Sequence, residues 1–109
     1  MLPHKHLSRV ERGTVASYLL SPGHPNGCAR ARFFVAHGFV ASEWYVLAAA
    51  LRMIGMSNPV VNARVSPYGT RCIVDGVLPC PDGGSNPVRT VWIIEPRRVG
   101  PRFVTAFPW

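Results

Sequence analysis

Acidic residues are scarce in this sequence, because five Asp and Glu face twelve Lys and Arg and leave a net charge of +7. His4 and His6 form an H-x-H pair, but it lies in an N-terminal stretch that we expect to be flexible. We therefore predict no metal site and no cofactor, and an acidic partner, either nucleic acid or protein. The five acids are scattered along the chain, at Glu11, Glu43, Asp75, Asp82 and Glu95.

Lysine is almost absent as well, since Lys5 is the single lysine beside eleven arginines. The guanidinium group suits flat, bidentate recognition of phosphate, although a GC-rich gene also replaces Lys by Arg. The three cysteines, Cys28, Cys72 and Cys80, have no metal-ligand spacing, and their odd number argues against a disulfide framework. We interpret them as small apolar residues of a protein in a reducing cytoplasm.

Long apolar runs are missing: none approaches the roughly 18 residues of a membrane span. The basic start of the chain is followed by no apolar segment of the signal-peptide kind, so we expect a cytoplasmic protein with no membrane partner. P-loop, dinucleotide-binding glycine and G-x-S-x-G motifs are also missing, which leaves a nucleotide-processing enzyme without a supporting motif. Cys28 follows His24 by four residues, but no third residue indicates a cysteine protease.

The 109 residues fit a single domain, which we place at residues 14–109 after a flexible tail at 1–13. Apolar residues recur at helical spacing before Asn58, and β-rich segments follow Pro59. Short connections favour antiparallel pairing, so the predicted fold class is α+β, with N-terminal helices packed on a four-stranded antiparallel sheet. Helices are expected at 14–20, 29–37 and 43–54, and strands at 60–65, 70–78, 88–95 and 102–107.

The side chains left for chemistry are His, Arg, Thr and Tyr, a set that suits metal-free cleavage of RNA. That reaction needs a base for the 2′-OH, an acid for the 5′-oxygen and cations for the phosphorane. His24 lies in a loop before a predicted helix that carries Arg30 and Arg32, and a helix start also favours an anion. An exposed loop histidine without a catalytic role is the alternative. His37, near a helix end, is interpreted as structural.

The strand 88–96, VRTVWIIEP, contains Arg89 and Thr90 where packing alone requires neither. Alternation places Phe103, Thr105 and Phe107 of the last strand on one face. Both strands have apolar residues on both faces, so polar residues at their ends can line the rim of a cleft. The alternative is that the threonines only favour strands and the arginines are solvated. The predicted rim comprises Arg89, Thr90, Thr105, Arg71 and Thr70.

Several segments resemble a small bacterial domain family that occurs as stand-alone proteins and as C-terminal domains of polymorphic toxins. They are YLLSPGHPNGCARARFF, SNPVV, SPYGTRCIVDGVL, PDG, VRTVWIIE and PRFVTAFP, and the resemblance covers about residues 15–108. The family pattern HP-x-G matches at His24, Pro25 and Gly27. Its following basic-Ala-x-Phe-Phe element matches at Arg30, Ala31, Phe33 and Phe34.

The closing VTAFP is similar to the VTAYP-like end of toxin ribonucleases in the barnase–colicin–RelE superfamily. That resemblance implies helices packed on a four-stranded antiparallel sheet, metal-independent RNA cleavage and an acidic immunity protein or antitoxin. Catalytic residues vary among its branches, so it assigns no residue here. Several members have Tyr in place of Phe107, so we expect no catalytic role there. The Lys-rich motif positions are Arg here, which excludes a lysine base in the helix.

These observations together predict a metal-independent ribonuclease toxin of a toxin–antitoxin or polymorphic-toxin system. The alternative is a non-catalytic basic module that binds nucleic acid or an acidic protein. The predicted catalytic residues are His24, Arg30, Arg71, Arg89, Thr90 and Thr105. The predicted substrate-binding residues are Arg32, Thr70, Tyr68 and Arg102.

Overall fold

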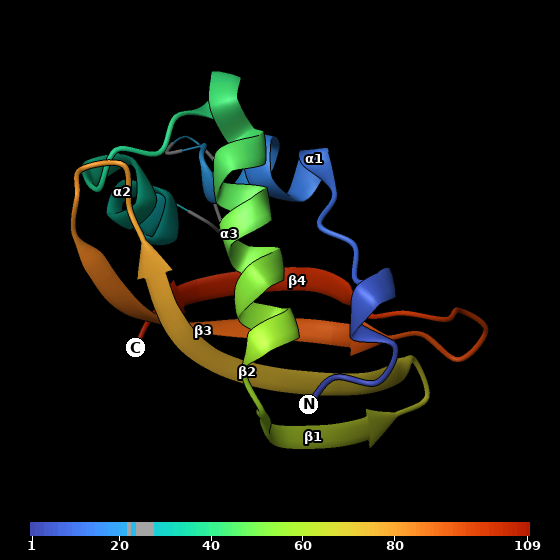
Figure 1. Ribbon diagram of the computed structural model, residues 1–109. Helices are drawn as coiled ribbons and strands as arrows, with labels where there is room; N and C mark the ends of the chain where they lie inside the picture. The colour runs from blue at the N-terminus through green and yellow to red at the C-terminus, as the bar shows by residue number, and fades with distance from the viewer. Residues whose placement is uncertain (22, 24–27) are drawn as a thin grey trace.

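The computed structural model describes residues 1–21, 23 and 28–109, and it confirms the predicted α+β class. Helices lie over one side of a curved sheet, as Figure 1 shows, and the strands follow the order β1-β2-β3-β4 with every neighbour antiparallel. The helical elements are η1 (Lys5–Leu7), α1 (Arg12–Thr14), η2 (Val15–Leu19), α2 (Cys28–Ala36), η3 (Ala41–Glu43) and α3 (Trp44–Ser57). The strands are β1 (Val60–Ser66), β2 (Gly69–Pro79), β3 (Ser85–Ile94) and β4 (Arg102–Pro108).

Two elements differ from their predicted bounds for local reasons. The helix expected at 14–20 is one short α-helical turn, α1, followed by the π-helical turn η2. The loop expected at 79–87 shortens, because the β2–β3 ladder continues to the pair Pro79 and Ser85. The sheet therefore extends further toward α2 than the proline content of that segment indicated.

Helix α3 packs closely against Trp92, which lies fully buried at the centre of the core. A Cβ on Gly55 would lie 2.6 Å from the Trp92 ring, so only glycine lets the helix approach this far. The Trp92 ring meets Phe103 edge-to-face at 5.4 Å, and Leu47 and Leu51 close the core from the helix side. This contact determines which face of the sheet α3 covers. Helix α3 leaves the opposite face uncovered.

A β-bulge in β4 changes the predicted alternation of that strand. Trp92 pairs with Phe103 but Val91 pairs with Thr105, so Val104 is an extra residue. Paired residues share a face, and Phe103 therefore faces α3 while Thr105 faces the opposite side. The prediction that Phe103 and Thr105 share a face is wrong, because alternation alone cannot locate a bulge.

Several of the first ten residues contact the rest of the domain. Leu2 is buried, and the Arg9 backbone bonds on both sides to the start of β4, through the Pro101 carbonyl and the Phe103 amide at 2.9 Å each. Arg52 of α3 donates to the carbonyls of Ser8 and His6. Flexibility of residues 1–13 stays a prediction, which hydrogen exchange at the Arg9 amide would test.

The ion pairs of Glu95 should make the stability of the protein depend on pH. Its carboxylate accepts a 3.1 Å hydrogen bond from Arg102 and lies 3.7 Å from Arg9. The Arg102 hydrogen bond lowers the Glu95 pKa below its ordinary 4.5, against desolvation, and the charges of Arg102, Arg98 and Arg9 add to the effect. Because the Glu95 pKa is lower in the folded than in the unfolded protein, the ionised carboxylate stabilises the fold at pH values above the unfolded-state pKa. This stabilisation is lost as the pH falls through the folded-state pKa.

We therefore expect Glu95→Gln to lower the melting temperature at neutral pH and to lower it less, or not at all, in acid. Thermal melts of both proteins at several pH values above and below 4.5 check this. A melting-temperature difference that stays constant across that range contradicts it.

Candidate functional site

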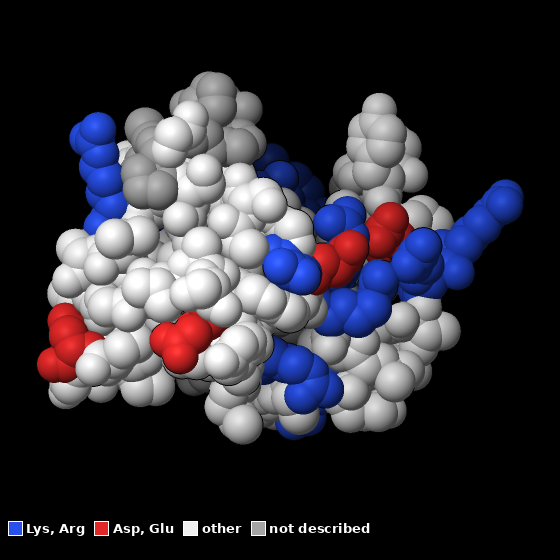
Figure 2. Space-filling view, turned by 90° about the horizontal axis from the view of Figure 1, so that it is seen from above, with Lys and Arg blue, Asp and Glu red and all other residues white. Residues whose placement is uncertain are grey.

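The sheet face opposite α3 carries a different set of side chains from the core face. Arg71, Ile73 and Asp75 of β2 pair with Ile93, Val91 and Arg89 of β3, so these six residues share that face. By contrast, Figure 2 shows the helical side from above as largely uncharged, with blue and red side chains interleaved at one end. Arg71 and Arg89 thus both lie on the sheet face opposite α3.

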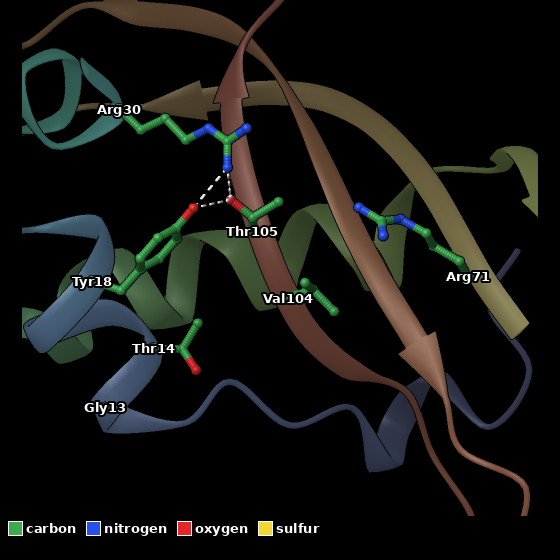
Figure 3. A pocket seen from close by; sticks show the side chains of 7 residues that line it. All are labelled: Gly13, Thr14, Tyr18, Arg30, Arg71, Val104 and Thr105. Atoms are coloured by element: carbon green, nitrogen blue, oxygen red, sulfur yellow. Dashed lines mark hydrogen bonds between the residues drawn. The ribbon is translucent and has the colours of Figure 1, made fainter. Parts of the chain in front are cut away.

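Arg30 is fixed at that edge by two hydroxyl groups. Its Nη1 donates to the Tyr18 hydroxyl at 2.7 Å and to Thr105 Oγ1 at 2.8 Å, and the two hydroxyl oxygens lie 3.5 Å apart. The guanidinium group also lies over the Phe107 ring, 5.1 Å from its centre. Figure 3 shows this cluster, with Arg30 reaching from α2 to β4. Within the described chain no carboxylate pairs with Arg30, so its charge is oriented and uncompensated.

A cavity of about 480 Å³ opens beside this cluster. The Arg71 side chain points from β2 toward β3, as Figure 3 shows, and it has no hydrogen bond or ion pair with any other described residue. Two guanidinium groups thus line one cavity, the first held by two hydroxyl groups and the second without a side-chain partner among the described residues. The lining residues are Gly13, Thr14, Tyr18, Arg30, Arg71, Val104 and Thr105.

Arg71 also lies directly opposite Arg64 on β1, where the two residues are cross-strand partners. Like charges in this position repel each other and destabilise a strand pair. A second hollow of about 270 Å³ joins the two, lined by Asn62, Arg64, Arg71 and Ile73. The arginines thus continue from the Arg30 cavity to the outer strand, and a bound anion would relieve their repulsion.

The cavity suits anion binding more clearly than proton transfer. Guanidinium forks and hydroxyl groups bind phosphate oxygens well, and Arg30 is already oriented for this. Among the described residues that line the cavity, none is His, Asp or Glu. A base or acid would have to be Tyr18, whose hydroxyl contacts Arg30, or a residue outside the described part of the chain. His24, predicted as the proton-transfer residue, lies outside the described residues.

Arg89, predicted as catalytic, is engaged by two neighbours. It makes a bidentate pair with its cross-strand partner Asp75, with distances of 2.8 and 2.9 Å, and it stacks 3.4 Å from the centre of the Trp109 ring. The hydrogen bonds to Asp75 raise the Arg89 pKa, so Arg89 keeps its proton and its positive charge. The structure therefore places Arg89 on the same sheet face as Arg71 with its charge already compensated.

Thr90, another predicted catalytic residue, is fully buried on the α3 side. Its hydroxyl donates to the Val74 carbonyl at 2.6 Å and accepts from Trp92 Nε1 at 2.8 Å. We therefore expect Thr90→Val to lower the free energy of unfolding by about 1–3 kcal/mol, because the indole N–H loses its buried partner. Urea denaturation measures the loss, with Thr70→Val on the half-exposed part of β2 as the control. A Thr90→Val protein that is fully stable but loses activity would contradict this structural role.

The predicted substrate-binding residues do not converge on the Arg30 cavity. Arg102 pairs with Glu95, and Thr70 lines a separate cavity of about 470 Å³ at the other end of the sheet, with His4 and Glu95. Tyr68 is 80% exposed in the β1–β2 turn, and Arg32 is exposed on α2. Of the predicted site residues, the structure thus brings together Arg30, Arg71 and Thr105.

Tyr18 is the site residue that the sequence interpretation missed. It lies in the helix predicted at 14–20, in which its neighbours Val15 and Leu19 are buried. Only the spatial meeting of η2, α2 and β4 shows that its hydroxyl reaches Arg30 and Thr105. Gly13 and Thr14, just before it, line the same cavity. No local motif marks any of these residues.

The domain is of the α+β class: helices cover one face of a four-stranded antiparallel sheet, and arginines lie on the other face. The chain belongs to the family described as a domain of unknown function, DUF6883, whose profile matches residues 1–109. No curated protein matches the sequence. The fold is similar to a chain in a contact-dependent growth inhibition toxin–immunity protein complex from Klebsiella pneumoniae 342. That likeness has a TM-score of 0.68 and 18% identity, and covers 92% of this chain and 98% of the other.

Proposed function

We propose that this protein is the toxin of a toxin–immunity system and that it cleaves RNA by metal-independent transesterification. The observation that carries the proposal is the Arg30 guanidinium, held by Tyr18 and Thr105 in a cavity that Arg71 also lines. The fold shared with a chain of a growth-inhibition toxin–immunity complex supports the toxin role. The net charge of +7 supports an acidic substrate.

The proposed reaction follows from the chemistry of the RNA backbone. The 2′-oxygen attacks the neighbouring phosphorus, a phosphorane forms, and the 5′-oxygen leaves as its bond to phosphorus breaks. Arg30 and Arg71 hold the two non-bridging oxygens, where negative charge increases in the transition state. Thr105 and Tyr18 keep Arg30 in place, so little reorganisation is needed when the charge develops.

We assign proton transfer to His24, which lies outside the described residues, and to the Tyr18 hydroxyl, which lines the cavity. His24 precedes Arg30 by six residues, and histidine changes its charge near neutral pH. The base removes the 2′-OH proton, and the acid returns a proton to the 5′-oxygen. Arg89, compensated by Asp75, acts in this scheme by supporting the sheet face on which Arg71 lies.

The proposed partner is a small acidic immunity protein or antitoxin that covers the arginines of the open sheet face. Opposite charges across such an interface increase the association rate and make the affinity fall with salt. Because RNA is the substrate, we place the action in the cytoplasm of the cell that the toxin kills.

A second function, binding of nucleic acid without cleavage, is favoured by one observation. The described lining of the cavity contains two arginines and no His, Asp or Glu. A basic module needs only the arginines, whereas a nuclease also needs the proton-transfer group. Growth arrest without any RNA cleavage would select this alternative.

Expression in bacteria tests the proposal. We expect the wild-type chain to arrest growth and cellular RNA to be fragmented. Co-expression of the immunity gene, sought beside the toxin gene, should restore growth. Normal growth at a verified level of folded protein, with intact RNA, would contradict the proposal.

A further inference from the structure

Three potential metal ligands meet where the end of α2 touches the β2–β3 loop. A ring nitrogen of His37, the Cys80 sulfur and a carboxylate oxygen of Asp82 all lie within 4.8 Å of one another. His37 Nδ1 is 2.8 Å from Asp82 Oδ2. Ligands around a tetrahedral zinc ion are about 3.5 Å apart, given bond lengths of roughly 2.0–2.3 Å. Small rotations of these side chains would therefore bring all three to bonding distance of one ion.

One backbone hydrogen bond joins the two segments, and a second closes the β2–β3 loop. The Asp82 amide donates to the His37 carbonyl at 3.3 Å, and the Cys80 amide donates to the Gly84 carbonyl at 2.9 Å. Gly38, with a φ of +100°, lets the chain turn at the end of α2, and a Cβ there would lie 3.0 Å from Pro81. The loop and the helix end are thus preorganised, and ordering the ligands would cost little entropy.

Each ligand is also oriented by a neighbour. Asp82 Oδ1 accepts from the Gly84 amide at 2.9 Å, which directs the other oxygen toward His37. The Asn86 side-chain amide donates to the Cys80 sulfur at 3.5 Å, a contact that would also stabilise a thiolate. The His37 ring lies against Phe33, with the ring centres 4.9 Å apart. Such surrounding contacts fix ligand geometry in protein metal sites.

We propose that His37, Cys80 and Asp82 form a site for a divalent transition-metal cation, with Zn²⁺ as the expected ion. A thiolate, an imidazole and a carboxylate suit a borderline-soft ion, whereas Mg²⁺ and Ca²⁺ prefer oxygen ligands alone. The cysteine loses its proton as the sulfur–metal bond forms, so binding releases a proton. The thiolate and the carboxylate balance the charge of the ion.

The site is independent of the proposed RNA chemistry. None of its three residues lines the Arg30 cavity. Cys80 is buried, while the side chains of His37 and Asp82 are 31% and 38% exposed, so the ion can enter from solvent. Bound metal would fasten the end of α2, the helix that carries Arg30, to the β2–β3 loop. We therefore expect metal binding to raise the stability of the protein.

Cobalt(II) is the probe, because a thiolate bound to it absorbs in the near-ultraviolet and tetrahedral cobalt absorbs strongly in the visible. We expect the reduced protein of residues 1–109 to bind one equivalent of cobalt with both signals, and Zn²⁺ to displace the cobalt and raise the melting temperature. Cys80→Ser should abolish the thiolate signal. Cys72→Ser, which removes the other buried cysteine of the described chain, should retain it.

Two further variants keep the test decisive if Cys80→Ser does not fold. His37→Gln and Asp82→Asn alter partly exposed side chains, and each should weaken metal binding by at least about 10-fold. The double variant His4→Gln/His6→Gln should bind as wild type, which excludes the N-terminal H-x-H pair. Absence of a thiolate–cobalt band, or a band and affinity that survive all three ligand substitutions, would overturn the proposal.

Discussion

Replacing Arg30 by alanine is expected to slow RNA cleavage by roughly 100- to 1000-fold while the protein remains folded. Its guanidinium is the one cation in the cavity whose position is fixed by hydroxyl groups, at 2.7 and 2.8 Å. A preoriented donor acts where charge develops in the transition state, so its removal raises the barrier of the chemical step. The effect should therefore fall on kcat more than on KM, in contrast to the loss of Arg71, which no described side chain holds in place.

Two companion variants and a stability measurement interpret that result. Arg30→Lys keeps the charge but cannot present a planar fork, so an intermediate rate is expected. Arg97→Ala removes an exposed arginine of the β3–β4 loop and should leave the rate unchanged. Thermal melts show whether the lost contact with Phe107 lowers stability. A folded Arg30→Ala protein that cleaves RNA at the wild-type rate would remove Arg30 from the proposed mechanism.

Trp92→Ala is expected to lower the free energy of unfolding by about 3–5 kcal/mol, the largest stability effect that we predict. Trp92 is fully buried between α3 and β4, and the close approach at Gly55 leaves no side chain that could move in to fill the space. The cavity left behind would persist. A loss of this size is a large part of the stability of a small domain.

Trp92→Phe is the matched control, because it keeps an aromatic ring against Phe103 while removing the indole N–H. We expect a loss clearly smaller than that of alanine. Urea denaturation of the three proteins measures both values, and the two variants should also separate packing from the hydrogen bond to Thr90. Equal losses for alanine and phenylalanine would mean that the hydrogen bond outweighs the packing.

The fold could be predicted because its signals are local. Apolar residues at helical spacing indicated α3, and the change of pattern at Asn58-Pro59 located the start of the sheet. Short connections then implied antiparallel order, which the structure confirms. The bulge at Val104 was not predictable, because a bulge depends on the neighbouring strand and leaves no mark in a single strand.

The candidate site was predictable only in part, because it depends on which distant residues meet. Arg30, Arg71 and Thr105 were chosen for their chemistry, and the structure places all three at one cavity. The pairing of Arg89 with Asp75 depends on the β2–β3 register, which sequence alone did not predict. The sequence also did not predict that His37 lies beside Cys80 and Asp82, because more than forty residues separate His37 from the other two.

The products of RNA cleavage test the central claim most directly. Purified wild-type protein should cut RNA in the presence of excess EDTA and leave fragments with 2′,3′-cyclic phosphate and 5′-hydroxyl ends, because the 2′-oxygen is the nucleophile. Arg30→Ala, prepared and assayed in parallel, should leave the RNA largely intact. Intact RNA with the wild-type protein, or fragments with 5′-phosphate ends that disappear in EDTA, would contradict the account.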